Sequence, residues 1–342
     1  MRSPFFDKGA AMLQSHSLVT QMTLEQLYEP IQPELRKVQE TVSRYWSDAI
    51  ALVRGPSGAP AQAGGKMLRP ALCLLSAGAS GARTLDAFVP LATACELLHI
   101  AALAHDDVVD HADRRRGTAS LNALWDDRTA VLSGDYLVAR SIALMAAYQS
   151  CGLIENTVTA LQRMTEGELV SFGKRGNAFT QHDCIELAER KTAIYFAVTC
   201  TAPTYLAGSS HREALKSFAM AFGIAFQIID DVLDIMKDQN ALGKPSCGDI
   251  VEGKQTLPLL FLREALDPAG QKRLHELAGR PLSDEDRRWA ANALEETGAK
   301  ARAEAVARQY ADTARHALGG LPDTPHKASM RGLAEFILVR NS

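Results

Sequence analysis

Apolar residues recur along most of this chain every three or four positions, the spacing that places them on one face of an α-helix. This pattern predicts helices over residues 68–80, 86–110, 119–124, 128–150, 152–170, 183–207, 211–237 and 255–266. A stretch rich in alanine and arginine, from about residue 283, is also expected to be helical, with a break near GGLPDTP. Since no β-rich alternation appears, we expect an all-α fold with a central apolar bundle.

Proline and glycine mark the interruptions between these segments. The amphipathic stretch 24–53 contains Pro30 and Pro33, which predict a break, and residues 55–65, 171–181 and 237–254 are expected to be loops. Residues 1–26 have weak periodicity and are interpreted as a loose N-terminal arm, without the pattern of a secretory signal. Residues 27–342 are expected to form one domain, because the two acidic motifs described next have to meet in space.

Two copies of one acidic motif stand inside apolar runs that are predicted to be helical. The first contains Asp106, Asp107 and Asp110, and the second contains Asp230, Asp231 and Asp234. On a helix, positions i and i+4 share a face with i+1 beside them, so each motif aims carboxylates at one spot. Mg²⁺ removes the cost of such a cluster and is commonly shared between carboxylates and substrate phosphates. We therefore interpret both motifs as metal ligands; two solvated helix ends are disfavoured because strongly apolar sequence precedes each motif.

Basic residues accompany the acidic motifs and would suit two separate diphosphates. Glycines before Lys66 let the backbone approach an anion closely, and three consecutive arginines follow the first motif. The candidate cations are Lys66, Arg69, Arg115, Arg116, Lys191, Lys244 and Lys254. An arginine triplet is usually a solvated patch, but its place beside a carboxylate cluster favours a phosphate-binding role. One diphosphate would be bound through metal and the other without it.

Composition and charge argue against several classes of protein. The chain has 342 residues, 46% of them hydrophobic, and a formal net charge of −3, which gives no footprint for nucleic acid. No apolar run is expected to reach the roughly 18 to 20 residues that a membrane span needs. Six cysteines are scattered without metal-ligand spacing, so we expect reduced, buried thiols and a cytoplasmic location.

In order and spacing, the segments GGKMLRP, DDVVDHADRRRG, GDYLVAR, ERKTA, FQIIDDVLD, LGKP and EGKQTLPLL resemble the trans-polyprenyl diphosphate synthase family over residues 28–340. One acidic motif alone also occurs in class I terpene cyclases, whereas the pair together with GGKxxRP is highly specific. The resemblance implies an isoprenoid synthase-type helical bundle with a central apolar cavity, a homodimer, and about three Mg²⁺ ions per active site. It also implies head-to-tail (1'-4) condensation of isopentenyl diphosphate onto farnesyl or geranyl diphosphate, through ionisation, condensation and elimination.

The same resemblance distributes the roles among the residues. The metal ligands are Asp106, Asp110 and Asp230, supported by Asp107, Asp231 and Asp234. The cations on the allylic diphosphate are Arg115, Lys191 and Lys244, and the dipoles for the allylic cation are Thr192 and Gln227. The residues for isopentenyl diphosphate are Lys66, Arg69, His99 and Arg116. His99 has the alternative of a core residue, and Lys254 is left open between the site and a loop. His105 and His111 are expected near the surface.

Small residues stand one helical turn before the first motif, where a bulky side chain would close the pocket beneath the reacting carbon. They are Ala101 and Ala102, so the tunnel is expected to continue to Met145 and Tyr148. We therefore predict a long product, on the order of thirty to fifty carbons, whose slow release would be helped by peripheral contact with a membrane. Close packing of helices is the alternative explanation of the small residues.

Two other functions stay open. A bulky floor on another helix would give a shorter geranylgeranyl or geranylfarnesyl product. The chain could also be the non-catalytic partner subunit of a two-component synthase, although every motif is intact. The sequence departs from the family at Thr118-Ala119-Ser120, where Lys-Pro-Thr is common, and at His111-Ala112, where acidic residues are usual. Neither change touches a residue assigned above.

Overall fold

The computed structural model describes residues 22–54, 65–115, 118–173, 179–236 and 246–340, and these are almost entirely helical. The helices of the first half are α1 (Leu24–Tyr28), α2 (Gln32–Arg54), α3 (Leu68–Ala79), α4 (Val89–Val109), α5 (Leu121–Leu124), α6 (Asp127–Ala146) and α7 (Cys151–Gly173). They are followed by α8 (Gln181–Ala188), α9 (Ile194–Thr201), α10 (Thr204–Ala207), α11 (Arg212–Met236) and α13 (Gly248–Val251). The last helices are α14 (Leu257–Ala265), α15 (Pro268–Leu277), α16 (Asp284–Glu296), α17 (Ala299–Ala317) and α18 (Pro325–Val339).

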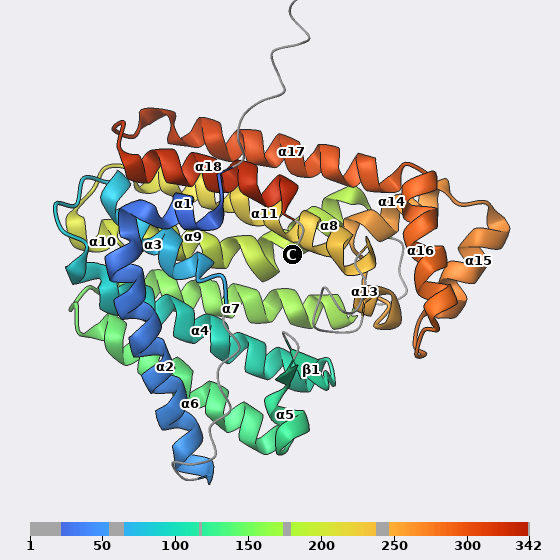
Figure 1. Ribbon diagram of the computed structural model, residues 1–342, viewed down its shortest axis with the longest axis horizontal. Helices are drawn as coiled ribbons and strands as arrows, with labels where there is room; N and C mark the ends of the chain where they lie inside the picture. Colours follow the sequence, from blue (N-terminus) through green and yellow to red (C-terminus); the bar gives the residue numbers. More distant parts are fainter. Residues whose placement is uncertain (1–21, 55–64, 116–117, 174–178, 237–245, 341–342) are drawn as a thin grey trace, which may run out of the picture.

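The long helices lie roughly side by side, with α9 near the middle of the bundle and α17 along one side (Figure 1). Phe196 of α9 contacts Phe222 and Phe226 of α11 at ring-centroid distances of 5.2 and 5.4 Å. Nearly every residue of α3 is buried as well. The prediction of an all-α fold with an apolar bundle core is confirmed.

Proline determines several helix boundaries, as the sequence predicts. A short 3₁₀ turn, Glu29–Ile31, separates α1 from α2 and contains Pro30. Helices α4, α14, α15 and α18 each have a proline in the first turn. Proline is tolerated in the first turn because a backbone N–H at that position would have no hydrogen-bond acceptor within the helix.

The structure differs from the sequence prediction in four places. The stretch 183–207 is interrupted by a π-helical turn, Glu189–Ala193, which separates α8 from α9. Helix α13 lies inside an expected loop, and α15 lies where no element was predicted. Strands β1 (Arg114–Arg115) and β2 (Thr118–Ala119) pair antiparallel, with Arg115 opposite Thr118. Two-residue strands are too short for hydrophobic alternation to reveal.

One helical span is more apolar than expected. Residues Asp86–Val109 are long and apolar enough to cross a membrane by length and composition, so the prediction that no run reaches this length is wrong. However, 67% of the most apolar window is buried against the rest of the bundle, as in the core helix of a globular protein.

The six cysteines are free thiols in the structure. Five are buried, and Cys151 at the start of α7 is the exposed exception.

Candidate active site

The first acidic motif ends α4. Asp106 and Asp107 lie in its last turns and Asp110 is its C-cap, after which His111 takes a positive φ of 50°. The ribbon of β1 and β2 then brings Arg115 back to the helix. Its Nε and Nη2 lie 2.7 and 2.6 Å from Asp107 Oδ1. Asp107 is only 4% exposed, so its carboxylate faces Arg115 rather than solvent.

The second acidic motif lies in the last turns of α11. Asp231 and Asp234 are buried there, whereas the side chain of Asp230 is 54% exposed. Gln227, one turn earlier, donates from Nε2 to Asp231 Oδ1 at 2.7 Å, and its Oε1 accepts from the Thr192 hydroxyl at 2.5 Å. The sequence-predicted pair of Thr192 and Gln227 is therefore brought together beside the motif.

Lys254 connects the two motifs across the site. Its Nζ lies 3.6 Å from Asp110 Oδ2, 4.0 Å from Asp249 Oδ1 and 2.6 Å from Glu252 Oε2. The N–H of Asp249 in turn donates to Asp234 Oδ2 at 3.1 Å. This chain of contacts joins α4 to α11, and Lys254 lies between the two motifs. β1 and α13 lie at the same end of the bundle, on the right of Figure 1.

Lys191 lies on the π-helical turn between α8 and α9. Such turns occur frequently at functional sites. Its Nζ lies 3.0 Å from Glu168 Oε1 on α7. Burial works against the charged ammonium, but Glu168 and Asp106 outweigh burial and raise the pKa of Lys191 above its ordinary value. Lys254 behaves likewise: burial opposes its charge, while Asp249, Asp110 and Glu252 raise its pKa.

Three carboxyl groups of the motifs resist ionisation. Burial raises the pKa of Asp106 and of Asp107, against the opposing effects of Lys191 and Arg115. Burial and the neighbouring Asp249 raise the pKa of Asp231 well above its usual range. A nearby cation favours the charged form of a carboxylate. The site therefore carries acidic groups whose ionisation an added cation would favour.

The donor set fits hard divalent cations, which prefer carboxylate and phosphate oxygens. Within the described residues, no three His, Cys, Asp or Glu side chains lie close enough to hold one metal ion. Instead, Arg115 holds Asp107, and Lys254 lies beside Asp110. That each motif aims two or three carboxylates at one metal ion remains a prediction.

The residues expected to bind isopentenyl diphosphate are spread around α3 and α4. Lys66 is exposed just before α3, and its carbonyl accepts from the Tyr28 hydroxyl at 2.8 Å. Arg69 stacks in the first turn of α3, with Cζ 4.8 Å from the Phe196 ring centroid. His99 is half-buried on α4, two turns before Asp106. The expected ligands Arg116 and Lys244 lie outside the described residues.

The candidate length-setting residues follow α4 away from the acidic motif. Ala101 is fully buried, and Ala102 is half-buried. Met145 is buried near the end of α6. The Tyr148 hydroxyl donates to the Ala87 carbonyl at 2.6 Å and accepts from the Leu91 N–H at 3.2 Å. Tyr148 thus marks the end of the bundle where α4 begins, opposite the acidic motifs.

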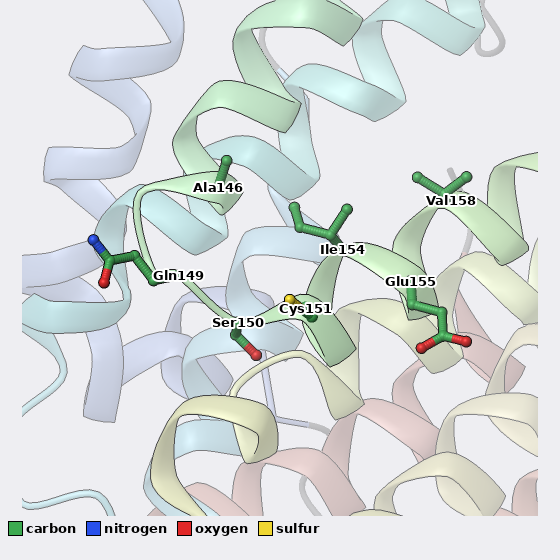
Figure 2. A pocket seen from close by; sticks show the side chains of 7 residues that line it. All are labelled: Ala146, Gln149, Ser150, Cys151, Ile154, Glu155 and Val158. Carbon is green, nitrogen blue, oxygen red and sulfur yellow. The ribbon is translucent and has the colours of Figure 1, made fainter.

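An apolar pocket lies at that same far end, where α6 turns into α7. It has a volume of about 660 Å³ and is lined by Ala146, Gln149, Ser150, Cys151, Ile154, Glu155 and Val158. Figure 2 shows these side chains around the turn. It lies apart from the cluster of charged groups at the acidic end.

Sequence reasoning missed three residues of the site. Glu168 pairs with Lys191, Glu252 pairs with Lys254, and Arg340 at the end of α18 contacts Asp230. The pairing of Glu252 with Lys254 could have been predicted, because an acidic residue stands two positions before the lysine in the sequence. For Glu168 and Arg340, no local pattern distinguishes them from ordinary surface charges.

Together, the fold and the site define a helical-bundle protein with two facing acidic motifs and basic side chains suited to a diphosphate. The Polyprenyl synthetase family model matches residues 51–295. All-trans-nonaprenyl-diphosphate synthase (geranyl-diphosphate specific) from Rhodobacter capsulatus is 37% identical over 69% of this chain and 73% of its own length. Heptaprenyl diphosphate synthase component 2 from Geobacillus stearothermophilus is 33% identical over 94% of this chain and 100% of its own length.

A solved structure agrees with these sequence matches. The crystal structure of polyprenyl synthase from Caulobacter crescentus CB15, complexed with calcium and isoprenyl diphosphate, is similar with a TM-score of 0.87 and 31% identity. The similarity covers 94% of this chain and 99% of that chain. The chain therefore belongs to the polyprenyl synthetase family, which confirms the resemblance seen in the sequence.

Proposed function

We propose that this chain is a trans-polyprenyl diphosphate synthase, a prenyltransferase that adds isopentenyl diphosphate to an allylic diphosphate. The observation that carries the proposal is the meeting of the two acidic motifs through Lys254 and Asp249. A single motif would serve one metal-bound diphosphate in many enzymes. Two facing motifs with Lys191 and Arg115 beside them suit ionisation of a diphosphate held between them.

The allylic diphosphate would bind at the acidic end through Mg²⁺. Asp106, Asp110 and Asp230 are the candidate ligands, with Asp231 and Asp234 behind them. When bound, the metal makes diphosphate a competent leaving group by neutralising its charge. The related polyprenyl synthase crystallised with calcium and isoprenyl diphosphate supports a divalent cation here.

The protein's own groups would guide the rest of the reaction. Lys191 and Arg115 attract the departing diphosphate, and Gln227 with Thr192 supplies fixed dipoles beside the carbon that becomes positive. Lys66, Arg69 and His99 would hold isopentenyl diphosphate, so that its double bond approaches that carbon. The released diphosphate is the proposed proton acceptor, since the mechanism assigns no protein base.

The proposed product is long, because the residues preceding the first motif are small. Ala102 is half-buried on α4, and bulky Met145 and Tyr148 lie at the end of the bundle opposite the acidic motifs. The names of the nonaprenyl and heptaprenyl relatives support this assignment. Peripheral membrane contact would assist release of such a product.

We also propose a homodimer in the cytoplasm. Large apolar side chains are exposed on α6 and α7, namely Val131, Leu132, Val158, Leu169 and Val170. Exposed apolar surface of this kind is typical of interaction sites. The free thiols support a reducing compartment.

The direct test is incubation of the purified chain with radiolabelled isopentenyl diphosphate, farnesyl diphosphate and Mg²⁺. Products are dephosphorylated and sized by reversed-phase chromatography, with EDTA as the control for metal removal. Incorporation that EDTA abolishes, with a product of about thirty carbons or more, is expected. No incorporation by the folded chain alone would contradict the proposal.

A partner-dependent synthase is the second candidate, and one finding favours it. The heptaprenyl relative that spans 94% of this chain is named as component 2, which implies a further component in that protein. The same assay decides between the two candidates, because a partner-dependent chain would be inactive alone and active with a second component added.

A further inference from the structure

The C-terminal helix ends against the second acidic motif. Arg340 follows α18, and its Nη2 lies 3.0 Å from Asp230 Oδ1 and 3.1 Å from the Phe226 carbonyl oxygen. Its Cζ lies 3.9 Å from the Phe226 ring centroid. The Arg340 side chain is only 5% exposed, although that of Asp230 is 54% exposed. The Arg340 guanidinium is therefore held in a buried position, while the Asp230 carboxylate remains accessible to solvent.

The position of Arg340 is set by the packing of α18. Met330, Leu333 and Ile337 bury one face of the helix, and the chain becomes extended at Arg340. A planar guanidinium can serve a carboxylate, a carbonyl and an aromatic face at once, which a lysine cannot do. Arg340 thus attaches the end of α18 to α11 by three kinds of contact.

We propose that Arg340 is a positioning residue of the second acidic motif, holding the Asp230 carboxylate in the metal-free protein and competing with the divalent cation for it. This inference rests on the proposed function, because it assumes that Asp230 binds metal. A divalent cation on Asp230 would lie close to the guanidinium, and like charges at that distance repel. Metal binding therefore has to weaken the contact of Arg340 with Asp230.

The effect of Arg340 on metal binding and the effect of the metal on the Arg340 contact must be equal in size. If Arg340 lowers the affinity of the cation, the cation must lower the stability of the Arg340 contact by the same factor. Loading the motif with metal would then loosen the last turn of α18. The stability of residues 335–340 would then depend on whether a metal ion is bound to the second acidic motif.

The test measures Mn²⁺ binding to the purified full-length protein by electron paramagnetic resonance, without any diphosphate. The variants are Arg340→Gln, Arg340→Lys and Asp230→Asn, and Arg331→Gln is the matched control. Arg331 is exposed on the same helix, so the control removes the same charge without touching α11. We expect Arg340→Gln to bind Mn²⁺ about three- to five-fold more tightly than the unchanged protein. Arg340→Lys keeps the positive charge but not the planar guanidinium, so its Mn²⁺ affinity should lie between those of Arg340→Gln and the unchanged protein. Arg331→Gln should bind Mn²⁺ as tightly as the unchanged protein.

Hydrogen exchange gives an independent readout. Mn²⁺ is expected to increase amide exchange in residues 335–340 of the unchanged protein, and not in Arg340→Gln. Unchanged or weaker Mn²⁺ binding by Arg340→Gln, or an equal gain in Arg331→Gln, would overturn the inference. If Asp230→Asn leaves Mn²⁺ binding unchanged, the metal role of the second motif fails as well. If Asp230→Asn weakens binding while Arg340→Gln does not alter it, only the role of Arg340 fails.

Discussion

At the scale of single residues, the site keeps carboxylates in places that disfavour their charge. Asp231 is the clearest case, because it is buried, lies near Asp249 and has one hydrogen bond from Gln227 to offset these effects. Functional sites commonly keep such unfavourable groups at the expense of stability. The same physical conditions make the group responsive to an incoming cation.

Asp231→Asn is expected to stabilise the metal-free protein at pH 8 by at least about 1 kcal/mol, because it removes a buried carboxyl group whose raised pKa lowers stability at this pH. A raised carboxyl pKa in the folded state gives stability that is present at low pH and lost as pH rises through that pKa. The melting temperatures of variant and parent should therefore converge as pH falls towards about 4. Thermal unfolding in EDTA measures this, and a gap that widens at low pH would contradict it.

Ala102 and Ala101 are neighbours in sequence but differ in the space around them. Because Ala102 is half-buried and Ala101 is fully buried, Ala102→Phe should shorten the product without loss of folding. Ala101→Phe should also destabilise the protein by about 1–3 kcal/mol through overpacking. Product sizing by chromatography and chemical unfolding measure the two effects.

The matched control for these two variants is Leu103→Phe. Leu103 is half-buried like Ala102, but it is turned by about 150° around the helix from the direction midway between Ala101 and Ala102. The control should therefore leave the product length unchanged. Unchanged product length in the Ala101 and Ala102 variants would contradict the open tunnel.

At the scale of elements, the π-helical turn that carries Lys191 is held between two glycines. A Cβ at Gly167 of α7 would lie 2.8 Å from Arg190 Cβ, and a Cβ at Gly223 of α11 would lie 2.5 Å from Ala193 Cα. Contacts this close involve the turn itself, so it cannot move without moving Lys191 and Thr192. The packing of α7 and α11 thereby sets the positions of Lys191 and Thr192, for which roles in the reaction are proposed.

Gly223→Ala is expected to displace the π-helical turn and lower kcat by about 10²-fold, the effect of a misplacement of about 1 Å. Overpacking should also cost about 1–3 kcal/mol of stability. Steady-state kinetics at a temperature where the variant remains folded separates the two effects. Gly319→Ala is the control, because a Cβ there meets nothing within 4 Å. Equal kcat values for Gly223→Ala and the parent would contradict the role of this contact.

The helices and the acidic motifs could be predicted from the sequence because each depends on residues that are close together in the chain. A helical period with carboxylates at i and i+4 is visible in any window that contains Asp106 or Asp230. Arg340 could not be predicted, since it meets Asp230 across a separation of 110 positions. The π-helical turn was also hidden, because one extra residue in a helix hardly changes the apolar spacing around Lys191. The metal-free placement of the carboxylates depends on partners, such as Lys254, whose distances no sequence pattern gives.

At the scale of the whole molecule, the charged residues of the site and the exposed apolar side chains of α6 and α7 are different sets of residues. The charged groups gather where α4 and α11 end, whereas the exposed large apolar side chains of α6 and α7 include Leu132 and Val158. Chemistry and assembly can therefore be tested by different substitutions.

The double variant Leu132→Glu with Val158→Glu is expected to convert the dimer to a monomer at micromolar concentration, because two buried charges would face apolar surface. Both side chains are about half exposed in the single chain, so folding should persist. Light scattering after size exclusion measures the mass, and Leu52→Glu on α2 is the control. A monomeric parent, or a dimer in the double variant, would contradict the assembly proposed here.

Helix α4 is fastened at both of its ends. Tyr148 binds its first turn through the Leu91 N–H, and Arg115 holds its last turn through Asp107. These two contact points lie about 24 Å apart along the helix, whose full length of 21 residues is about 31 Å. The growing product would then extend along α4 from the acidic motif, and the position of the first bulky side chain along the helix would set its length. Chain length would be counted in helical turns, so substitutions along α4 should change the product in discrete steps.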